Sequence, residues 1–168
     1  MKIPRLLPGG KRHILMVCGA NVCRSPMAEA LLRHKLELVG LDGRFKVHSA
    51  GTRAMVGAPP DPRVVEVLRA NGIAPPKGHA RQANPRELAK MDLILVMERK
   101  HLEQLPPLDA RPKGGTPRLI TDFSAQLEGQ EIPDPYFGNK AGFEHVHELL
   151  STALDAVVER ALPPLLEE

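Results

Sequence analysis

Short apolar runs alternate along this chain with segments whose apolar residues recur at helical spacing. The apolar runs predict buried strands, because strands covered on both faces are hydrophobic throughout. We expect these strands over residues 12–17, 45–49, 92–97 and 118–121. We expect helices over residues 26–39, 61–71, 85–90, 99–105 and 141–162. Strands that alternate with helices indicate an α/β fold, in which helices cover both faces of a parallel sheet.

The length of 168 residues predicts a single domain, which we place at residues 12–168 after an N-terminal extension of residues 1–11. No apolar run approaches the roughly 20 residues that cross a membrane, and no signal-type stretch follows the basic N-terminus. We therefore expect a cytoplasmic protein without membrane insertion. A formal net charge of +3 and an aromatic content of 3% argue against nucleic acid as a partner.

The candidate chemistry lies between the first strand and the first helix, where residues 18–26 read Cys-Gly-Ala-Asn-Val-Cys-Arg-Ser-Pro. Parallel sheets bind ligands at the carboxyl ends of their strands. A turn at the start of a helix directs several backbone N–H groups into one concavity, which suits a phosphate dianion. We expect the phosphate cradle to consist of Gly19, Ala20, Asn21, Val22, Cys23 and Arg24.

Cys18, at the start of this cradle, is the candidate nucleophile, because the helix dipole and Arg24 would hold it as a thiolate. Arg24 can bind two phosphate oxygens with its planar fork. Ser25 can donate a hydrogen bond to the Cys18 sulfur and make it a better leaving group. The alternative is a buried strand-end cysteine beside a surface arginine. The position of the motif between a strand and a proline-started helix favours the catalytic interpretation.

Phosphate transfer to sulfur also needs an acid to protonate the leaving oxygen, and two Asp-Pro pairs are candidates. Asp61 has a sufficient local explanation as the N-cap of the helix that follows it. Asp134 lies in a loop stiffened by two prolines, close to Tyr136, the only tyrosine of the chain. We therefore predict that Asp134 is the acid, and that loss of Asp61 affects stability with little effect on turnover.

The cysteine loop resembles the Cys-x-Gly-Asn-x-Cys-Arg-Ser signature of the low-molecular-weight protein tyrosine phosphatases, and residues 134–136 resemble that family's general-acid loop. Further segments match in order at residues 49–52, 61–63, 80–82, 92–97 and 142–144. The resemblance implies a four-stranded parallel sheet with helices on both faces, a phosphate-binding loop after strand 1, and neither metal nor organic cofactor. It implies hydrolysis of phosphotyrosine through a cysteinyl-phosphate intermediate, with Asn21 and Ser49 supporting the loop.

The chain departs from the family pattern at four places, one of which is Phe137 in place of the second tyrosine after Asp-Pro. The loop glycine is replaced by Ala20, which would cost about 1–2 kcal/mol if that position required a left-handed backbone. The histidine that often precedes Ala-Arg-Gln by two residues is Gly78, with His79 shifted by one, so the resemblance does not carry over this histidine's support of the phosphate loop. The aromatic wall after residues 49–52 is replaced by Met55, which leaves Met55 and Tyr136 as the expected substrate wall.

The short, non-aromatic loop around Met55 resembles bacterial phosphatases of exopolysaccharide regulation, which implies an autophosphorylating tyrosine kinase as a partner among phosphotyrosine proteins.

Arsenate reductases of this fold need cysteines downstream of Cys23, and none follows. Protein arginine phosphatases of this fold usually carry threonine at the position of Val22. Outside these enzymes, the alternative is a non-catalytic phosphate-binding or thiol redox-sensing module. Cys23 is either a redox partner of Cys18 or a buried apolar residue.

Overall fold

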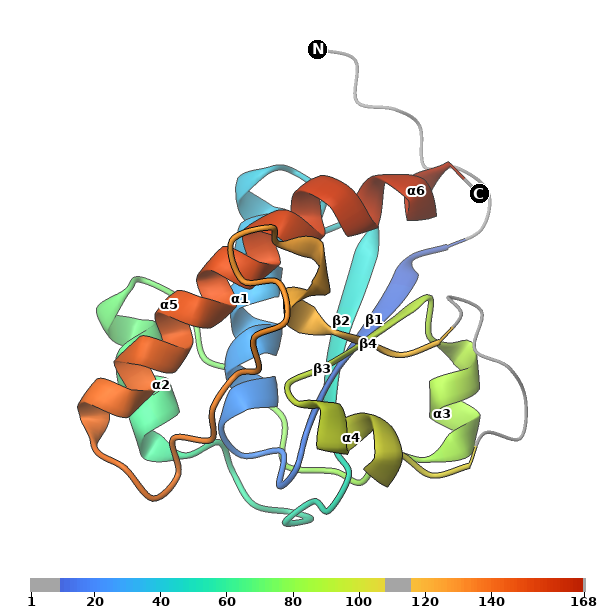
Figure 1. Cartoon of the computed structure of the whole chain (residues 1–168). Coiled ribbons are helices and arrows are strands. Elements are labelled where there is room, and N and C mark those ends of the chain that lie inside the picture. The colour runs from blue at the N-terminus through green and yellow to red at the C-terminus, as the bar shows by residue number, and fades with distance from the viewer. Residues whose placement is uncertain (1–9, 108–115, 168) are drawn as a thin grey trace.

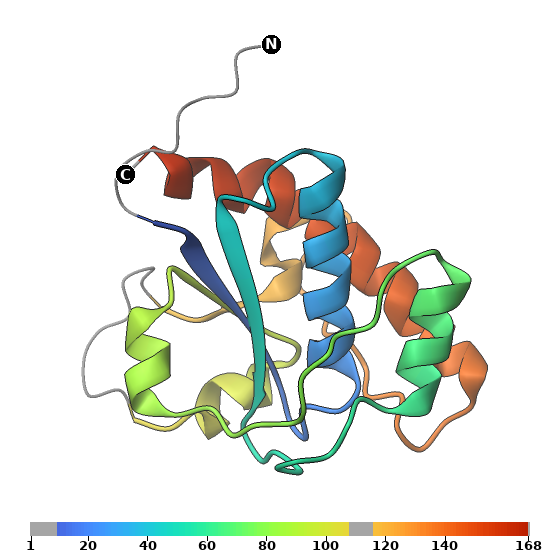
Figure 2. The ribbon, with the colours of Figure 1, turned by 180° about the vertical axis from the view of Figure 1, so that it is seen from behind.

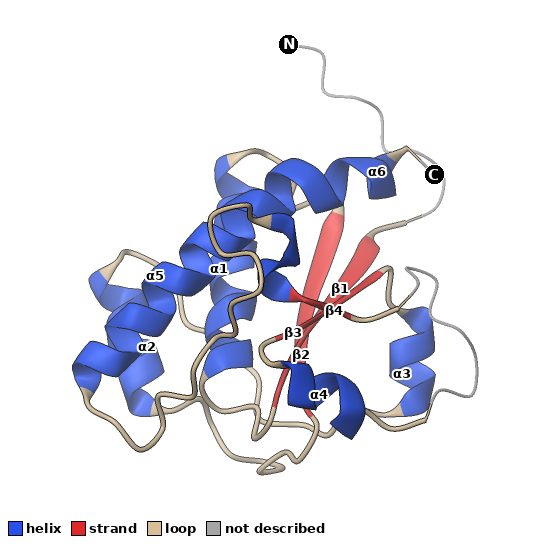
Figure 3. Ribbon diagram, viewed as in Figure 1, coloured by secondary structure: helices blue, strands red, loops and turns tan. Residues whose placement is uncertain are grey.

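The computed structural model describes residues 10–107 and 116–167 of the chain. In this part of the chain four strands form one parallel sheet with the order β2-β1-β3-β4, shown in red in Figure 3. The strands are β1 (Arg12–Cys18), β2 (Phe45–Gly51), β3 (Leu93–Val96) and β4 (Arg118–Leu119). The predicted four-stranded parallel sheet is confirmed.

Strand β1 lies in the middle of the sheet and ends at the candidate nucleophile. It pairs with β2 from Arg12–Phe45 to Cys18–Gly51, and on its other edge with β3. The chain therefore adds β2 on one side of β1, and then β3 and β4 on the other side. This arrangement makes the carboxyl end of β1 a topological switch point, which is where such sheets bind ligands.

Helices cover both faces of the sheet, as Figures 1 and 2 show from opposite sides. On one face, Ile14 and Met16 of β1 share an apolar core with three helices. Those helices are α1 (Arg24–Leu38), α2 (Pro62–Ala70) and α5 (Lys140–Ala156). On the other face, Leu15 and Val17 pack with Leu88 of α3 (Pro85–Lys90), and α4 (Arg99–Gln104) follows β3 on that side. The alternation of side chains along β1 thus places the two cores.

The elements differ from the sequence prediction mainly at their ends. The last strand is short and continues into a 3₁₀ helix, Ile120–Phe123. The predicted C-terminal helix is interrupted by a π-helical turn, Val157–Ala161, before α6 (Leu162–Leu166). Two consecutive prolines, residues 163 and 164, lack the N–H groups that would continue the regular pattern into that turn.

Part of the N-terminal extension and part of the segment between the predicted helix at 99–105 and the predicted strand at 118–121 lie outside the described residues. None of the helices that the structure describes is both long enough and apolar enough to cross a membrane.

Candidate active site

A cavity of about 240 Å³ opens at the carboxyl end of β1. The phosphate loop lines one side of the cavity. Met55 and residues of the loop that carries the predicted acid Asp134 line the rest, and this segment, residues 133–139, is called the acid loop below. The cavity brings together most of the sequence-predicted residues, which are Cys18, Ala20, Val22, Cys23, Arg24, Met55, Asp134 and Tyr136. The other predicted residues, Gly19, Asn21, Ser25 and Ser49, do not line it. One further residue, Phe137, also lines it.

The backbone of the phosphate loop is held by the segment that follows β2. The carbonyl groups of residues 18, 19 and 20 accept hydrogen bonds from the N–H groups of residues 52, 53 and 55, at 2.9–3.0 Å. This close approach needs Gly51, because a Cβ there would lie 2.4 Å from the Gly19 carbonyl oxygen. The loop conformation is therefore fixed by backbone contacts before any ligand binds.

The left-handed position of the loop is Asn21, with a φ of 60°, and not Ala20. Among the described residues Asn21 is the one non-glycine residue with a positive φ. Asparagine tolerates this region because its short polar side chain can hydrogen-bond locally. The strain considered for Ala20 is consequently absent from this loop.

The Asn21 side chain is the centre of a buried polar network. Its Nδ2 donates to Ser25 Oγ at 2.8 Å and to Ser49 Oγ at 3.0 Å. Its Oδ1 accepts a hydrogen bond from the backbone N–H of Arg81 at 3.0 Å. The contact expected between Asn21 and Ser49 is present. The support on the side of Gly78 comes from the Arg81 backbone, which the sequence did not indicate.

The predicted pairing of Cys18 with Ser25 is also present. The Cys18 Sγ lies 2.9 Å from Ser25 Oγ, and both residues are buried. Because Asn21 donates to the same hydroxyl oxygen, the hydroxyl hydrogen of Ser25 is free to point at the sulfur. The network thus orients Ser25 as a donor to Cys18.

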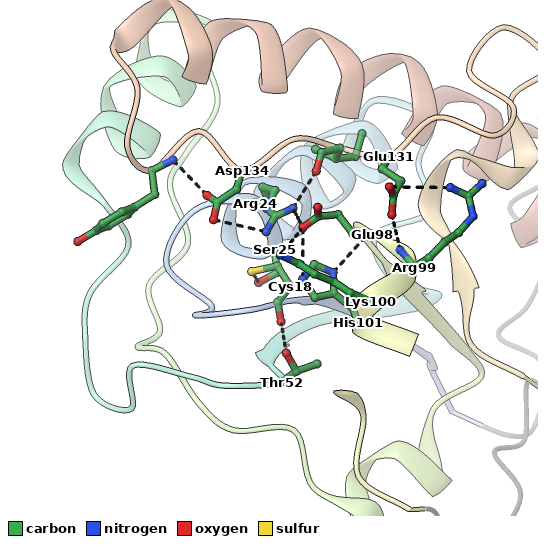
Figure 4. Close-up of polar contacts among 12 residues, drawn as sticks. Cys18, Arg24, Ser25, Thr52, Glu98, Arg99, Lys100, His101, Glu131 and Asp134 are labelled. Carbon is green, nitrogen blue, oxygen red and sulfur yellow. Dashed lines mark hydrogen bonds and ion pairs between the residues drawn. The ribbon is translucent and has the colours of Figure 1, made fainter. Parts of the chain in front are cut away.

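The guanidinium of Arg24 is held on one side by two acceptors (Figure 4). Its Nη1 donates to Glu98 Oε2 at 2.6 Å and to the carbonyl of Ile132 at 2.8 Å. Its Nη2 lies 3.8 Å from Asp134 Oδ2. Burial raises the pKa of Glu98, but the hydrogen bond and the charge of Arg24 outweigh burial and bring that pKa below its ordinary value.

His101 lies beneath this ion pair and is completely buried. Its Nδ1 accepts a hydrogen bond from the Glu98 backbone N–H at 3.0 Å, so a neutral ring carries its proton on Nε2. Burial and the nearby charge of Arg24 lower the pKa of His101 to about 4. A neutral His101 therefore fixes the backbone at Glu98 without adding a second positive charge.

The acid loop forms the open rim of the cavity. The Asp134 side chain is 48% exposed, and its Oδ1 accepts a hydrogen bond from the Tyr136 backbone N–H at 3.1 Å. The rings of Tyr136 and Phe137 meet edge to face, and Phe137 is 95% exposed. Met55 and Tyr136, the residues expected as substrate wall, both line this cavity.

Asp61, the second Asp-Pro aspartate, does not line the cavity. Its carboxylate accepts a hydrogen bond from the Arg63 backbone N–H at 2.9 Å, which is the predicted N-cap of α2. Cys23 is buried nearby, and burial, followed by the negative charge of Asp61, raises the pKa of its thiol to about 12. Cys23 is therefore a thiol at neutral pH, and a thiol is a poor nucleophile.

Besides Phe137 and His101, sequence reasoning missed three residues that hold the site together. Glu98 holds Arg24, and its one sequence signal is its place just beyond the carboxyl end of β3. Arg81 supports Asn21 through its backbone, which no side-chain pattern could indicate. Arg63 reaches the carbonyl groups of Tyr136 and Gly138 from the start of α2.

Comparison with known proteins places this arrangement in a family. The family model of the low molecular weight phosphotyrosine protein phosphatases matches residues 13–162. The chain belongs to this family. Among relatives, the low molecular weight protein-tyrosine-phosphatase Etp of Escherichia coli K12 is 39% identical, over 83% of this chain and 88% of its own length.

Solved structures agree with this assignment. The crystal structure of YfkJ from Bacillus subtilis has a TM-score of 0.81 and 31% identity, covering 90% of this chain and 95% of that one. A structure of the arginine phosphatase YwlE has a TM-score of 0.79 and 25% identity, covering 90% of this chain and 96% of that one. Members of this fold therefore differ in substrate, and the choice of substrate has to be argued from the cavity.

Proposed function

We propose that this protein hydrolyses phosphotyrosine side chains of proteins through a cysteinyl-phosphate intermediate. The observation that carries the proposal is the single cavity lined by Cys18, Arg24 and Asp134, in a loop whose polar network points Ser25 at the Cys18 sulfur. These are a nucleophile, an oxyanion-binding cation and an acid, which together are the groups that phosphate transfer to sulfur requires.

In the first step the substrate phosphate binds to the N–H groups of the loop and to the guanidinium of Arg24. The Cys18 thiolate attacks phosphorus, and the bond from phosphorus to the phenolic oxygen breaks. Asp134 gives its proton to that oxygen, so tyrosine leaves as a neutral phenol.

In the second step Asp134, now a carboxylate, takes a proton from a water molecule. The resulting hydroxide attacks phosphorus, the sulfur–phosphorus bond breaks, and inorganic phosphate leaves. Ser25 hydrogen-bonds to the departing Cys18 sulfur and stabilises its negative charge. The reaction restores the thiolate and the protonated acid, and therefore needs no metal or organic cofactor.

The rim of the cavity favours an aryl phosphate over an arginine phosphate. Met55, Tyr136 and Phe137 offer apolar surface to a flat ring, and Val22 adds a branched apolar side chain from the phosphate loop itself. A planar guanidinium would gain more from a hydroxyl partner at the position of Val22, where protein arginine phosphatases of this fold usually carry threonine. We infer that the physiological substrate is an autophosphorylating tyrosine kinase. We place the reaction in the cytoplasm, where reducing conditions keep Cys18 a free thiol.

The test is a turnover comparison on phosphotyrosine, phosphoserine and phosphoarginine peptides, with Cys18→Ser as the control. We expect phosphotyrosine to be hydrolysed fastest, and Cys18→Ser to bind inorganic vanadate while turning over none of the three. Faster turnover of phosphoarginine would instead make the chain an arginine phosphatase. Retained vanadate binding by the unmodified protein without turnover of any peptide would favour a non-catalytic module.

A further inference from the structure

Arg63 makes an unusual set of contacts for a surface arginine on the first turn of a helix. Its Nη2 donates to the Tyr136 carbonyl at 2.9 Å and its Nη1 to the Gly138 carbonyl at 3.1 Å. The guanidinium carbon lies 4.2 Å from the ring centroid of Phe143, on the first turn of α5. Arg63 therefore contacts both the acid loop and the helix that follows it.

Asp61 connects the same guanidinium to the phosphate loop. Its Oδ1 and Oδ2 accept hydrogen bonds from Arg63 Nε at 3.0 Å and Nη2 at 2.9 Å, a bidentate pairing. The backbone N–H of Asp61 donates to the carbonyl of Val22 at 2.8 Å. A continuous path of hydrogen bonds thus joins Val22, in the phosphate loop, to Tyr136, two residues after the acid.

The acid loop has few other attachments among the described residues, and one of them is the ion pair of Arg24 Nη2 with Asp134 Oδ2 at 3.8 Å. Ile132 is anchored by the Met97 carbonyl and by Arg24, but Asp134 and Phe137 are exposed. The other hydrogen bonds of residues 133–139 stay within the loop or join it to the start of α5. In the part of the chain that the structure describes, Arg63 donates the two hydrogen bonds that tie this loop to the α2 side of the cavity.

We propose that Arg63, oriented by Asp61, is a positioning residue that holds the acid loop at a fixed distance from the phosphate loop and thereby places the Asp134 carboxyl over the leaving oxygen. The proposal rests on the proposed function, because it needs Asp134 to act as the acid. It also gives Asp61 a second role beside the cap that the sequence assigned to it. Misplacing an acid by about 1 Å can cost up to roughly 100-fold in rate.

The test variant is Arg63→Met, which keeps an apolar stem of similar length but loses every hydrogen bond. The measurement is the single-turnover rate of cysteinyl-phosphate formation on p-nitrophenyl phosphate and on a phosphotyrosine peptide. Nitrophenolate leaves as a stable anion, so its release needs the acid little. We expect a loss within about twofold on p-nitrophenyl phosphate and about 10-fold to 100-fold on phosphotyrosine, with inhibition by inorganic phosphate unchanged.

A double-mutant cycle with Asp134→Ala tests whether Arg63 acts through the acid. If it does, Arg63→Met has no further effect once Asp134 is absent. An equal additional loss in the Asp134→Ala background, or equal losses on both substrates, would overturn the proposal. Asp134→Ala without any dependence on the leaving group would instead remove the acid assignment, and the role of Arg63 with it.

Three further variants separate positioning from general stability. Arg118→Met removes an arginine that likewise stacks on a ring, Phe123, and pairs with Asp122, away from the cavity. It should leave both rates unchanged. Asp61→Asn keeps an N-cap but loses the ion pair, and should give the same dependence on leaving group with a smaller loss. Arg63→Lys retains the charge and serves as the test variant if Arg63→Met folds poorly. Its rate on the phosphotyrosine peptide should lie between those of Arg63→Met and the unmodified protein.

Discussion

The carboxylate of Glu98 accepts a hydrogen bond from Nη1 of Arg24 at 2.6 Å, and the carbonyl of Ile132 accepts a second from the same nitrogen at 2.8 Å. Both N–H groups of Nη1 are therefore committed. The edge formed by Nε and Nη2 remains for the phosphate, and a planar fork held on one side presents the other side in a fixed direction. In the proposed mechanism, Glu98 thus orients Arg24 for bidentate phosphate binding before the substrate arrives.

Glu98→Gln should lower kcat/KM about tenfold, because a neutral amide holds the guanidinium less firmly and leaves its charge uncompensated. Arg24→Lys should lose most activity, since an ammonium cannot form the fork. Steady-state kinetics on an aryl phosphate measure both. Glu131→Gln is the matched control, because Glu131 pairs with Arg99 and does not line the cavity. Equal effects of the two glutamate substitutions would exclude a special role for Glu98.

The fold and the phosphate loop can be predicted from local sequence patterns. The apolar run of β1, the cysteine at its end and the proline at the start of α1 are adjacent in sequence, so their relation is visible without a structure. The partners of Arg24 cannot be identified in this way. Glu98 and Ile132 reach it from segments that only the sheet topology brings together, and polar residues after strands are too common to single out.

The backbone at Asn21 explains how the loop accommodates Ala20. We expect Ala20→Gly to leave the turnover rate nearly unchanged, because Ala20 does not occupy the left-handed region. Asn21→Ala should be far more damaging. It places an alanine at a φ of 60°, which costs about 1–2 kcal/mol, and removes the hydrogen bonds to Ser25, Ser49 and Arg81.

Thermal unfolding and turnover of the two variants, measured in parallel, test this assignment. A larger loss in Ala20→Gly than in Asn21→Ala would contradict it. Asn21→Gly separates the two contributions, because glycine relieves the backbone strain but cannot replace the side-chain network.

Stability should fall as the pH decreases from about 6.5 toward about 4. Burial, together with the neighbouring His13, lowers the pKa of His48 to about 4, and burial with the charge of Arg24 does the same for His101. Unfolded histidine has a pKa of about 6.5, so in this window the unfolded chain binds protons that the folded chain does not. Lowering the pH through this window therefore favours the unfolded chain. The resulting loss of stability is complete below about pH 4.

Urea unfolding at pH 7 and pH 5 measures this effect. His48→Gln and His101→Asn should each show a smaller decrease than the unmodified protein, because neither amide takes up a proton. In His48→Gln the amide replaces His48 Nε2 in the hydrogen bond with His13. In His101→Asn the amide oxygen replaces His101 Nδ1 as the acceptor of the Glu98 backbone N–H. His145→Gln, at an exposed position on α5, is the matched control. A pH dependence that persists unchanged in both test variants would contradict the assignment.

Cys23 lines the same cavity as Cys18, five positions along one loop, and its thiol is the group placed to capture an oxidised Cys18. Peroxide should convert the Cys18 sulfur to a sulfenic acid; attack by Cys23 then forms the disulfide and releases water, and a thiol reductant restores both cysteines. The raised pKa of Cys23, about 12, keeps the attacking thiolate scarce at neutral pH, so trapping should accelerate as pH rises.

Cys23→Ser should retain most phosphatase activity but lose recovery after peroxide, because Cys18 then proceeds to irreversible oxidation states. The measurement is the fraction of activity restored by reductant after a peroxide pulse at several pH values, with mass spectrometry to detect the disulfide. Equal recovery in both proteins, without a disulfide in the unmodified one, would make Cys23 a packing residue. Its burial against the core is sufficient reason for a small apolar side chain at that position.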